Sequence, residues 1–198
     1  FAGMTGEVKL ELLQEALNFP IPQYAHLPLI LGQDRSKLSK RHGAVSVAEY
    51  RKEGYLPEAM VNFMALLGWN PGTDKEIYTM EELIQDFSLE RVQKSGAIFN
   101  LQKLEYFNGV HIRKKPLNDL TALCLPYLVE AGFIEPIFED RQYPPAYGGY
   151  VPTTRYKILA TGEIVGEEFL QKIVALYQER LKKLKEIIEL TDFFFKNK

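Results

Sequence analysis

The sequence is poor in cysteine: Cys124 is the only one among 198 residues. A lone cysteine excludes an internal disulfide and a zinc site built from several cysteines, and a reducing cytoplasm is the simplest compartment. No apolar run approaches the roughly 18 residues of a membrane-spanning helix, so no membrane partner is expected. Residues 1–5 lack the basic start and apolar core of a signal peptide. A helical pattern follows them almost at once, and we expect an internal piece of a longer protein.

A surplus of positive charge is also missing. The chain has 24 Lys and Arg against 26 Asp and Glu, which gives a formal net charge of −2. These totals argue against a strongly basic nucleic-acid binder, so any nucleic-acid surface must come from local clusters of charge. With 46% hydrophobic and 25% charged residues, the composition is that of a folded globular chain.

The patterning that is present is mostly helical. Apolar residues recur at helical spacing in four segments, 7–17, 57–67, 100–114 and 117–130. Capping-box sequences at Ser46 and Thr79 predict two further helix starts. A last apolar stripe predicts one long amphipathic helix over about 166–194. Only the apolar run 27–31 is typical of a buried strand.

The segment GQDRSKLSKRHG, residues 32–43, is a polar loop bounded by glycines that could let it open and close. Lys37 and Lys40 stand three residues apart with the Ser39 hydroxyl between them. Two ammonium groups and a hydroxyl at this spacing can close around a polyphosphate. Positive charge placed where phosphate charge develops accelerates transfer at phosphorus. The alternative, from these letters alone, is a solvated basic loop.

The stretch HLPLILGQDRSKLSKRHG, residues 26–43, resembles the second signature of class I aminoacyl-tRNA synthetases, usually written KMSKS. The KLSKRHG form after AHLPLI is similar to bacterial glutamyl-tRNA synthetases in particular. The resemblance continues through AVSVAEYRKEGYLPEAMVNFMALLGWNPG, EIYTMEELIQDFSLERV and FNLQKLEYFNGVHIR. It covers about residues 10–113, weakens beyond them, and returns in RLKKLKEIIELTDFFF at 180–195.

The resemblance implies roles for individual residues. In that family the second lysine of the signature contacts the ATP phosphates and stabilises the transition state of adenylate formation, which is Lys40 here. Lys37 would be the second catalytic lysine of the same loop. Arg41 stands where the general class pattern has serine, as is usual for this family. The ATP-binding residues implied are Leu29 and Ile30, whose backbone would lie beside the adenine, and Lys37, Ser39, Lys40 and Arg41.

The implied reaction has two steps. Glutamate and ATP, the latter with Mg, give glutamyl-adenylate and pyrophosphate, and the glutamyl group then passes to the terminal adenosine of tRNA(Glu). The other class signature, HIGH, is absent from this sequence, since none of the histidines His26, His42 and His111 stands in an HxGH pattern. The glutamate pocket also belongs to the half that carries HIGH. We therefore expect no metal site in this chain, a monomer, and no aminoacylation by the chain alone.

Two basic clusters, at 111–115 and 180–185, follow the loop. Taken alone, each is typical of a solvated helix face. In the family, these helices lie along the inner side of the tRNA, where phosphate contacts are independent of base sequence. The tRNA-contacting residues expected are Arg113, Lys114, Lys115, Arg180 and Lys183.

The fold expected is mainly α, in three parts. Residues 1–31 would be the tail of a class I nucleotide-binding, Rossmann-like domain, and 32–115 the signature loop with a helical stem-contact domain. Residues 116–198 would be a first anticodon-binding helical subdomain, with an irregular insertion at about 133–165. Two alternatives remain: a stand-alone tRNA-binding module without catalysis, which the intact KLSKR disfavours, and a glutaminyl-tRNA synthetase. Whether tRNA(Gln) is also charged is left open by the sequence.

Overall fold

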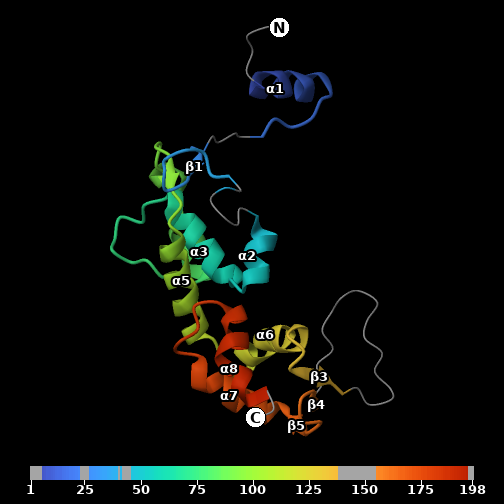
Figure 1. The fold of residues 1–198 in the computed structure, drawn as a ribbon. Coiled ribbons are helices and arrows are strands. Elements are labelled where there is room, and N and C mark those ends of the chain that lie inside the picture. Colours follow the sequence, from blue (N-terminus) through green and yellow to red (C-terminus); the bar gives the residue numbers. More distant parts are fainter. Residues whose placement is uncertain (1–5, 23–26, 40, 42–45, 138–154, 196–198) are drawn as a thin grey trace.

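The structure, a computed structural model, describes residues 6–22, 27–39, 41, 46–137 and 155–195. It is mainly helical, as expected, and its elements follow one another along an elongated molecule (Figure 1). One end holds α1 (Gly6–Ala16), which stands apart (Figure 1). The middle holds β1 (Ile30–Leu31), α2 (Val47–Glu53), α3 (Pro57–Gly68), α4 (Met80–Asp86), β2 (Ala97–Ile98) and α5 (Leu101–Lys114). The other end holds α6 (Leu117–Glu130), β3 (Ile134–Pro136), β4 (Arg155–Ile158), β5 (Ile164–Gly166), α7 (Glu167–Tyr177) and α8 (Ile187–Phe195).

The helix starts predicted from capping boxes are confirmed. The Ser46 side chain accepts from the Glu49 backbone N–H, and the Glu49 carboxylate accepts from that of Ser46. Thr79 makes the equivalent pair of bonds at the start of α4. Each reciprocal pair satisfies backbone donors that the first turn of a helix leaves without partners. Gly54 ends α2 at φ +89°, a left-handed conformation that favours glycine.

The middle unit is built on α3 packed against α5, around aromatic side chains. Phe63 of α3 meets Phe107 of α5 edge to face at 6.1 Å between ring centroids, a favourable geometry for aromatic pairs. The buried members of this aromatic cluster are Tyr50, Tyr55, Phe63, Phe99, Leu104 and Phe107. The cluster fixes the surface on which the signature loop lies.

A buried polar network ties α3 to α5 beside this cluster. Asn62 accepts from the Tyr78 backbone N–H, donates to the Glu76 carbonyl, and its Oδ1 lies 3.1 Å from Nε2 of His111. Since that oxygen only accepts, the His111 Nε2 must carry the proton. Burial lowers the pKa of His111, Glu58 raises it, and Lys114 and Lys115 lower it further, so the net shift is downward.

Acidification is therefore expected to destabilise the chain through His111. Its pKa in the folded state lies below the value of about 6.5 for an unfolded chain, so unfolded molecules bind more protons as pH falls below 6.5. The free energy of unfolding should fall from pH 7.5 to 5.5, by at most about 1.4 kcal/mol per pH unit from this group. In urea titrations at both pH values, His111→Gln should lose less stability than the parent. Equal losses in both proteins would contradict this assignment.

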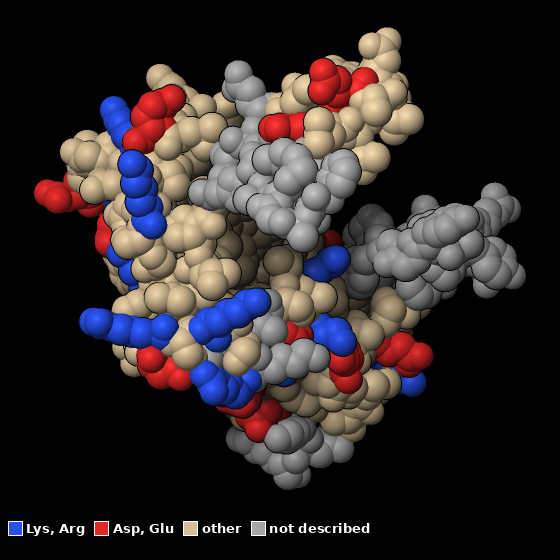
Figure 2. Space-filling model, turned by 90° about the horizontal axis from the view of Figure 1, so that it is seen from above, with Lys and Arg blue, Asp and Glu red and all other residues tan. Residues whose placement is uncertain are grey.

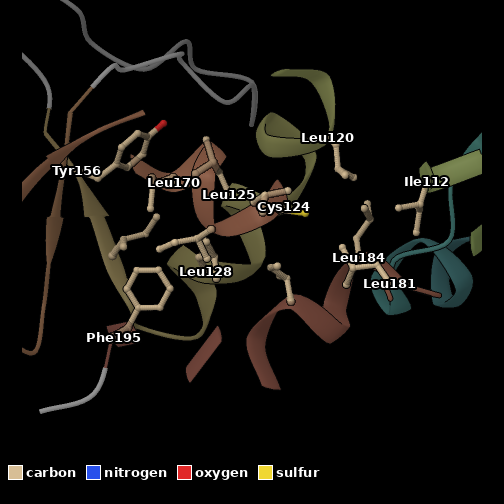
Figure 3. Packing of buried hydrophobic residues seen from close by; sticks show 14 of the residues in the cluster. Ile112, Leu120, Cys124, Leu125, Leu128, Tyr156, Leu170, Leu181, Leu184 and Phe195 are labelled. Atoms are coloured by element: carbon tan, nitrogen blue, oxygen red, sulfur yellow. The ribbon is translucent and has the colours of Figure 1, made fainter. Parts of the chain in front are cut away.

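The far unit joins helices α6, α7 and α8 to an antiparallel sheet in the order β3, β4, β5. These strands lie within about 133–165, where the sequence predicted only irregular structure, while residues 138–154 lie outside the described part. The core of this unit also takes in Leu56 and Ala59 of the α2–α3 region and Ile112 of α5. Figure 3 shows Ile112 on the side of the cluster where Leu181 and Leu184 lie. The apolar core therefore runs on from the far unit into the middle unit.

The single long helix predicted over about 166–194 is wrong. Helix α7 ends at Tyr177, residues 178–183 form a turn, and a short 3₁₀ helix (Leu184–Glu186) leads into α8. Tertiary hydrogen bonds replace those a continuous helix would make: Leu184 N donates to the Gly54 carbonyl, and the Lys182 carbonyl accepts from Asn108. The apolar period of the sequence continues across the turn because Leu181 and Leu184 still enter the core.

The lone thiol has no chemical role that the structure reveals. Cys124 is fully buried in α6 within the far core. Burial raises its pKa to about 12, so it stays protonated and poorly reactive at neutral pH. In the part of the chain that the structure describes, no helix is long and apolar enough to cross a membrane.

Candidate functional site

The signature loop leaves the short strand β1, turns back at once and pairs with it. Leu31 and Lys37 form an antiparallel bridge, Leu38 N donates to the Ile30 carbonyl, and Gly32 N donates to the Ser36 carbonyl. On its other edge β1 pairs in parallel with β2, and Phe99 N donates to the Leu31 carbonyl. The first half of the KLSKR segment is thus one arm of a tight hairpin.

A cluster of side chains closes the tip of this hairpin. Asp34 Oδ1 accepts from both the backbone N–H and the hydroxyl of Ser36, at 3.0 and 2.7 Å. Asp34 Oδ2 accepts from Nη2 of Arg41 at 3.3 Å, and the same nitrogen donates to Ser36 Oγ. Arg35 between them takes a positive φ of 59°. Sequence reasoning missed Asp34 and Ser36, although an Asp two residues before a Ser is a common turn signal.

The structure brings several of the predicted ATP-binding residues together on this hairpin. Ile30 is half-buried in β1, while Leu29 just before it and the side chain of Lys37 are exposed. Ser39 is half-buried, and Arg41 is held by Asp34 and Ser36 in this conformation. Lys40, the residue expected to be catalytic, lies outside the described residues. Among the residues described, no three His, Cys, Asp or Glu side chains are grouped so as to hold a metal ion.

Leu38 anchors the hairpin. Its side chain packs against the aromatic cluster of the middle unit, beside Ile30. A cavity of about 360 Å³ opens at this base, lined by Gln33 and Leu38 from the loop, Tyr50, Tyr55 and Phe99 from the cluster, and Lys183. Gln33 also donates through Nε2 to the Phe99 carbonyl at 3.2 Å. The apolar residue between Lys37 and Ser39 therefore fixes the loop to α3 and α5 through their shared core.

The two basic clusters lie side by side, although about 70 residues separate them in the sequence. Gln178, in the turn, donates through Nε2 to the carbonyls of Ile112, Arg113 and Lys115 at 3.2, 3.3 and 2.9 Å. The end of α5 and the 178–183 turn thus meet at a junction.

Of the five predicted tRNA contacts at this junction, two are paired with carboxylates. Lys115 Nζ lies 2.5 Å from Glu58, and Lys183 Nζ lies 3.6 Å from Glu105. Burial raises the pKa of Glu58, but the hydrogen bond from Lys115, a backbone hydrogen bond and the charges of Lys115 and His111 together leave that pKa below its usual value. Within the described part of the chain, no ion pair involves the other three, Arg113, Lys114 and Arg180.

Charged side chains of both signs lie on the face of the molecule that Figure 2 shows. In the space-filling view from above, acidic and basic side chains are interspersed over the face that is seen (Figure 2). This agrees with the net charge of −2 and means that nucleic-acid contact would depend on local groups of cations.

Comparison with known families assigns both ends of this arrangement. The family described as tRNA synthetases class I (E and Q), catalytic domain, matches residues 5–106, which include the hairpin and the middle unit up to the first half of α5. The anticodon binding domain family matches residues 119–198, the far unit. The chain therefore belongs to the class I tRNA synthetases of the E and Q type.

Individual relatives of the chain narrow the comparison to glutamate–tRNA ligases. The chain is 46% identical over 186 residues to glutamate–tRNA ligase 1 of Caldicellulosiruptor saccharolyticus. The aligned stretch covers 94% of this chain and 33% of that protein. It is 58% identical over 123 residues to the glutamate–tRNA ligase of Carboxydothermus hydrogenoformans, 62% of the chain and 26% of that protein. A crystal structure of a glutamate tRNA ligase from Elizabethkingia meningosepticum in complex with its amino acid matches with a TM-score of 0.64 and 31% identity, over 94% of this chain and 35% of that one. The chain thus spans about a third or less of the length of these relatives.

Proposed function

We propose that this chain is the ATP-loop and tRNA-docking part of a glutamate–tRNA ligase. The observation that carries the proposal is the first half of the KLSKR segment, Lys37 and Leu38, held as one arm of a hairpin against a helical unit, in a chain similar to glutamate–tRNA ligases over 94% of its length. A module that only bound tRNA would have no use for paired lysines in such a loop.

In the proposed chemistry, a carboxylate oxygen of glutamate attacks the α-phosphorus of ATP, the bond to the bridging oxygen breaks, and pyrophosphate leaves. Lys37 and Lys40 supply positive charge where negative charge grows on the phosphates. Leu38 and Asp34 hold the loop that carries them, through the aromatic cluster and through Arg41. Mg²⁺ would arrive with ATP as part of the substrate, and no described residue of this chain is assigned to it.

The apolar surface around α1 supports an incomplete catalytic domain. Large apolar side chains from here to β1 are exposed: Leu10, Leu12, Leu13, Leu17, Phe19, Ile21, Leu27 and Leu29. Exposed apolar side chains gathered on one segment are typical of a surface that another part of a protein covers. In the proposed enzyme this partner is the rest of the catalytic domain, which brings the glutamate pocket and the HIGH signature. The isolated chain is accordingly expected to form no adenylate.

We propose that tRNA docks at the junction between α5 and the turn. Arg113, Lys114 and Arg180 present cations there, from two segments that Gln178 ties together. Contacts of this kind reach phosphates and carry no base specificity.

Charge reversal at the junction is expected to weaken tRNA binding. The variant Lys114→Glu with Arg180→Glu should lower the affinity of the chain for tRNA(Glu) and lower the slope of log K against log salt by about two, roughly one for each phosphate contact. A salt-titrated binding assay with tRNA(Glu) and an unrelated tRNA measures both. The matched control is Lys157→Glu, an exposed lysine on β4 in the same unit. Unchanged affinity in the double variant, or an equal loss in the control, would exclude this docking face.

A further inference from the structure

Two side-chain amides cross the junction in opposite directions, one from α5 and one from the 178–183 turn. Asn108, fully buried on α5, donates through Nδ2 to the carbonyls of Lys182 at 2.6 Å and Gly54 at 3.2 Å, and its Oδ1 accepts from Leu56 N at 2.8 Å. In the opposite direction, Gln178 in the turn donates to carbonyls at the end of α5. Each segment therefore satisfies backbone carbonyls of the other.

These bonds supply donors to backbone carbonyls and also join the two segments to each other. The last carbonyls of a helix lack partners within the helix, and Gln178 supplies a donor to those of Arg113 and Lys115. The Ile112 carbonyl, which Gln178 also reaches, accepts from Lys115 N as well. The Lys182 carbonyl lies in a turn that interrupts the helical pattern, and Asn108 supplies its donor. Leu184 N donates to the Gly54 carbonyl at 3.0 Å, so this carbonyl accepts both from Leu184 and from Asn108. Asn108 is fully buried with both its amide oxygen and its amide nitrogen bonded, and a buried, satisfied polar group of this kind favours one arrangement of the elements it joins.

We infer that Asn108 and Gln178 form a reciprocal amide clamp that positions the two halves of the tRNA-docking face. This rests on the proposed function, since Gln178 bonds the carbonyl of Arg113, next to Lys114, and stands two residues before Arg180. With the clamp closed, cations from α5 and from the turn meet one RNA backbone as a single surface. Without it, the two segments vary in position, and binding must first fix them at a cost in affinity.

The same clamp reaches the signature loop through the core. Asn108 follows Phe107, and Gly54 precedes Tyr55; both aromatic residues belong to the cluster on which Leu38 lies. The far unit is therefore fixed to the surface that holds the ATP loop. Asn108 and Gln178 contact neither substrate in this scheme and act as positioning residues.

The test uses two variants that remove the amide donors: Gln178→Met adds no charge, whereas Asn108→Asp also places a carboxylate beside the carbonyls of Lys182 and Gly54. Asn108→Asp keeps the acceptor for Leu56 N but loses both donated bonds, and Gln178→Met is close in shape but cannot donate. The matched control is Asn62→Leu, which removes an equally buried amide whose bonds stay within the middle unit. Spin labels on Lys52→Cys and Lys172→Cys, exposed on α2 and α7, report the distance between the units. The buried Cys124 should stay unlabelled.

Both clamp variants should broaden the distance distribution and raise the Kd for tRNA(Glu) about three- to tenfold, with the full salt dependence kept. Asn62→Leu should lower the melting temperature while leaving the distance and Kd unchanged. Clamp variants with a narrow distribution and parental Kd, beside a charge-reversal variant that has lost affinity, would overturn the clamp and leave the docking face intact. Parental Kd in the charge-reversal variant as well would overturn the docking face itself, and with it the clamp's role. If Asn108→Asp does not fold, the distance distribution and the Kd of Gln178→Met decide whether the clamp exists.

Discussion

Replacing Lys40 with alanine in the complete protein is expected to slow adenylate formation by about 30- to 1000-fold. This is the effect of removing one preorganised group, about 2–4 kcal/mol, that stabilises charge developing in a transition state. Because the ammonium acts mainly on the transition state, the rate constant should fall more than the affinity for ATP. Single-turnover formation of the adenylate, with ATP, glutamate and tRNA(Glu) present, measures both quantities.

The control for loss of a positive charge is Lys157→Ala, since Lys157 is an exposed lysine on β4 of the far unit. It should leave the rate within about twofold, as expected of a surface substitution remote from the chemistry. A Lys40→Ala enzyme with the parental rate would remove this residue from the mechanism. A fall in ATP affinity with an unchanged rate constant would instead make Lys40 a binding residue only.

Gly54→Ala is expected to be the most destabilising small substitution at the junction. At φ +89° an added methyl group costs about 1–2 kcal/mol in backbone strain. A Cβ there would also lie 2.6 Å from the backbone nitrogens of both Leu184 and Lys185, which can yield only if the chain between α7 and α8 moves. That overlap adds about 1–3 kcal/mol. The free energy of unfolding, from urea titration of this chain, should fall by the sum of the two.

Gly72→Ala separates strain from overlap. Gly72 also has a positive φ, of 77°, but a Cβ there would meet nothing within 4 Å. The free energy of unfolding of Gly72→Ala should therefore fall only by the strain contribution of about 1–2 kcal/mol. Equal losses at both glycines would mean that the middle and far units are not packed against each other at Gly54 as the structure has them.

The sequence predicted best where local chemistry decides the structure. The capping residues Ser46 and Thr79 mark helix starts because their side chains bond within the same turn. The helix predicted over 100–114 is α5, and Asn100 caps it by accepting from Lys103 N, a bond that was not predicted from the sequence. The KLSKR segment was recognisable through its resemblance to a family signature, since its letters alone also fit a solvated basic loop.

Prediction failed where distant segments decide. The helix expected over about 166–194 breaks because Asn108 and Gly54, more than 70 residues earlier, offer partners to Lys182 and Leu184. No local sequence pattern predicts hydrogen bonds between segments so far apart. Strands β4 and β5 were missed because each has only three or four residues, too few for an alternating pattern to stand out. The adjacency of the two basic clusters likewise follows from Gln178 and is invisible in either cluster alone.

The central claim is that this chain serves glutamate–tRNA ligation. The most direct measurement is the charging of tRNA(Glu) by the complete protein with labelled glutamate or labelled glutamine, in parallel with the isolated chain and with ATP withheld as a control. We predict ATP-dependent formation of glutamyl-tRNA by the complete protein, none with glutamine, and none by the isolated chain. Charging with glutamine in place of glutamate, charging by the isolated chain, or a folded complete protein that binds tRNA(Glu) without charging it would contradict the account.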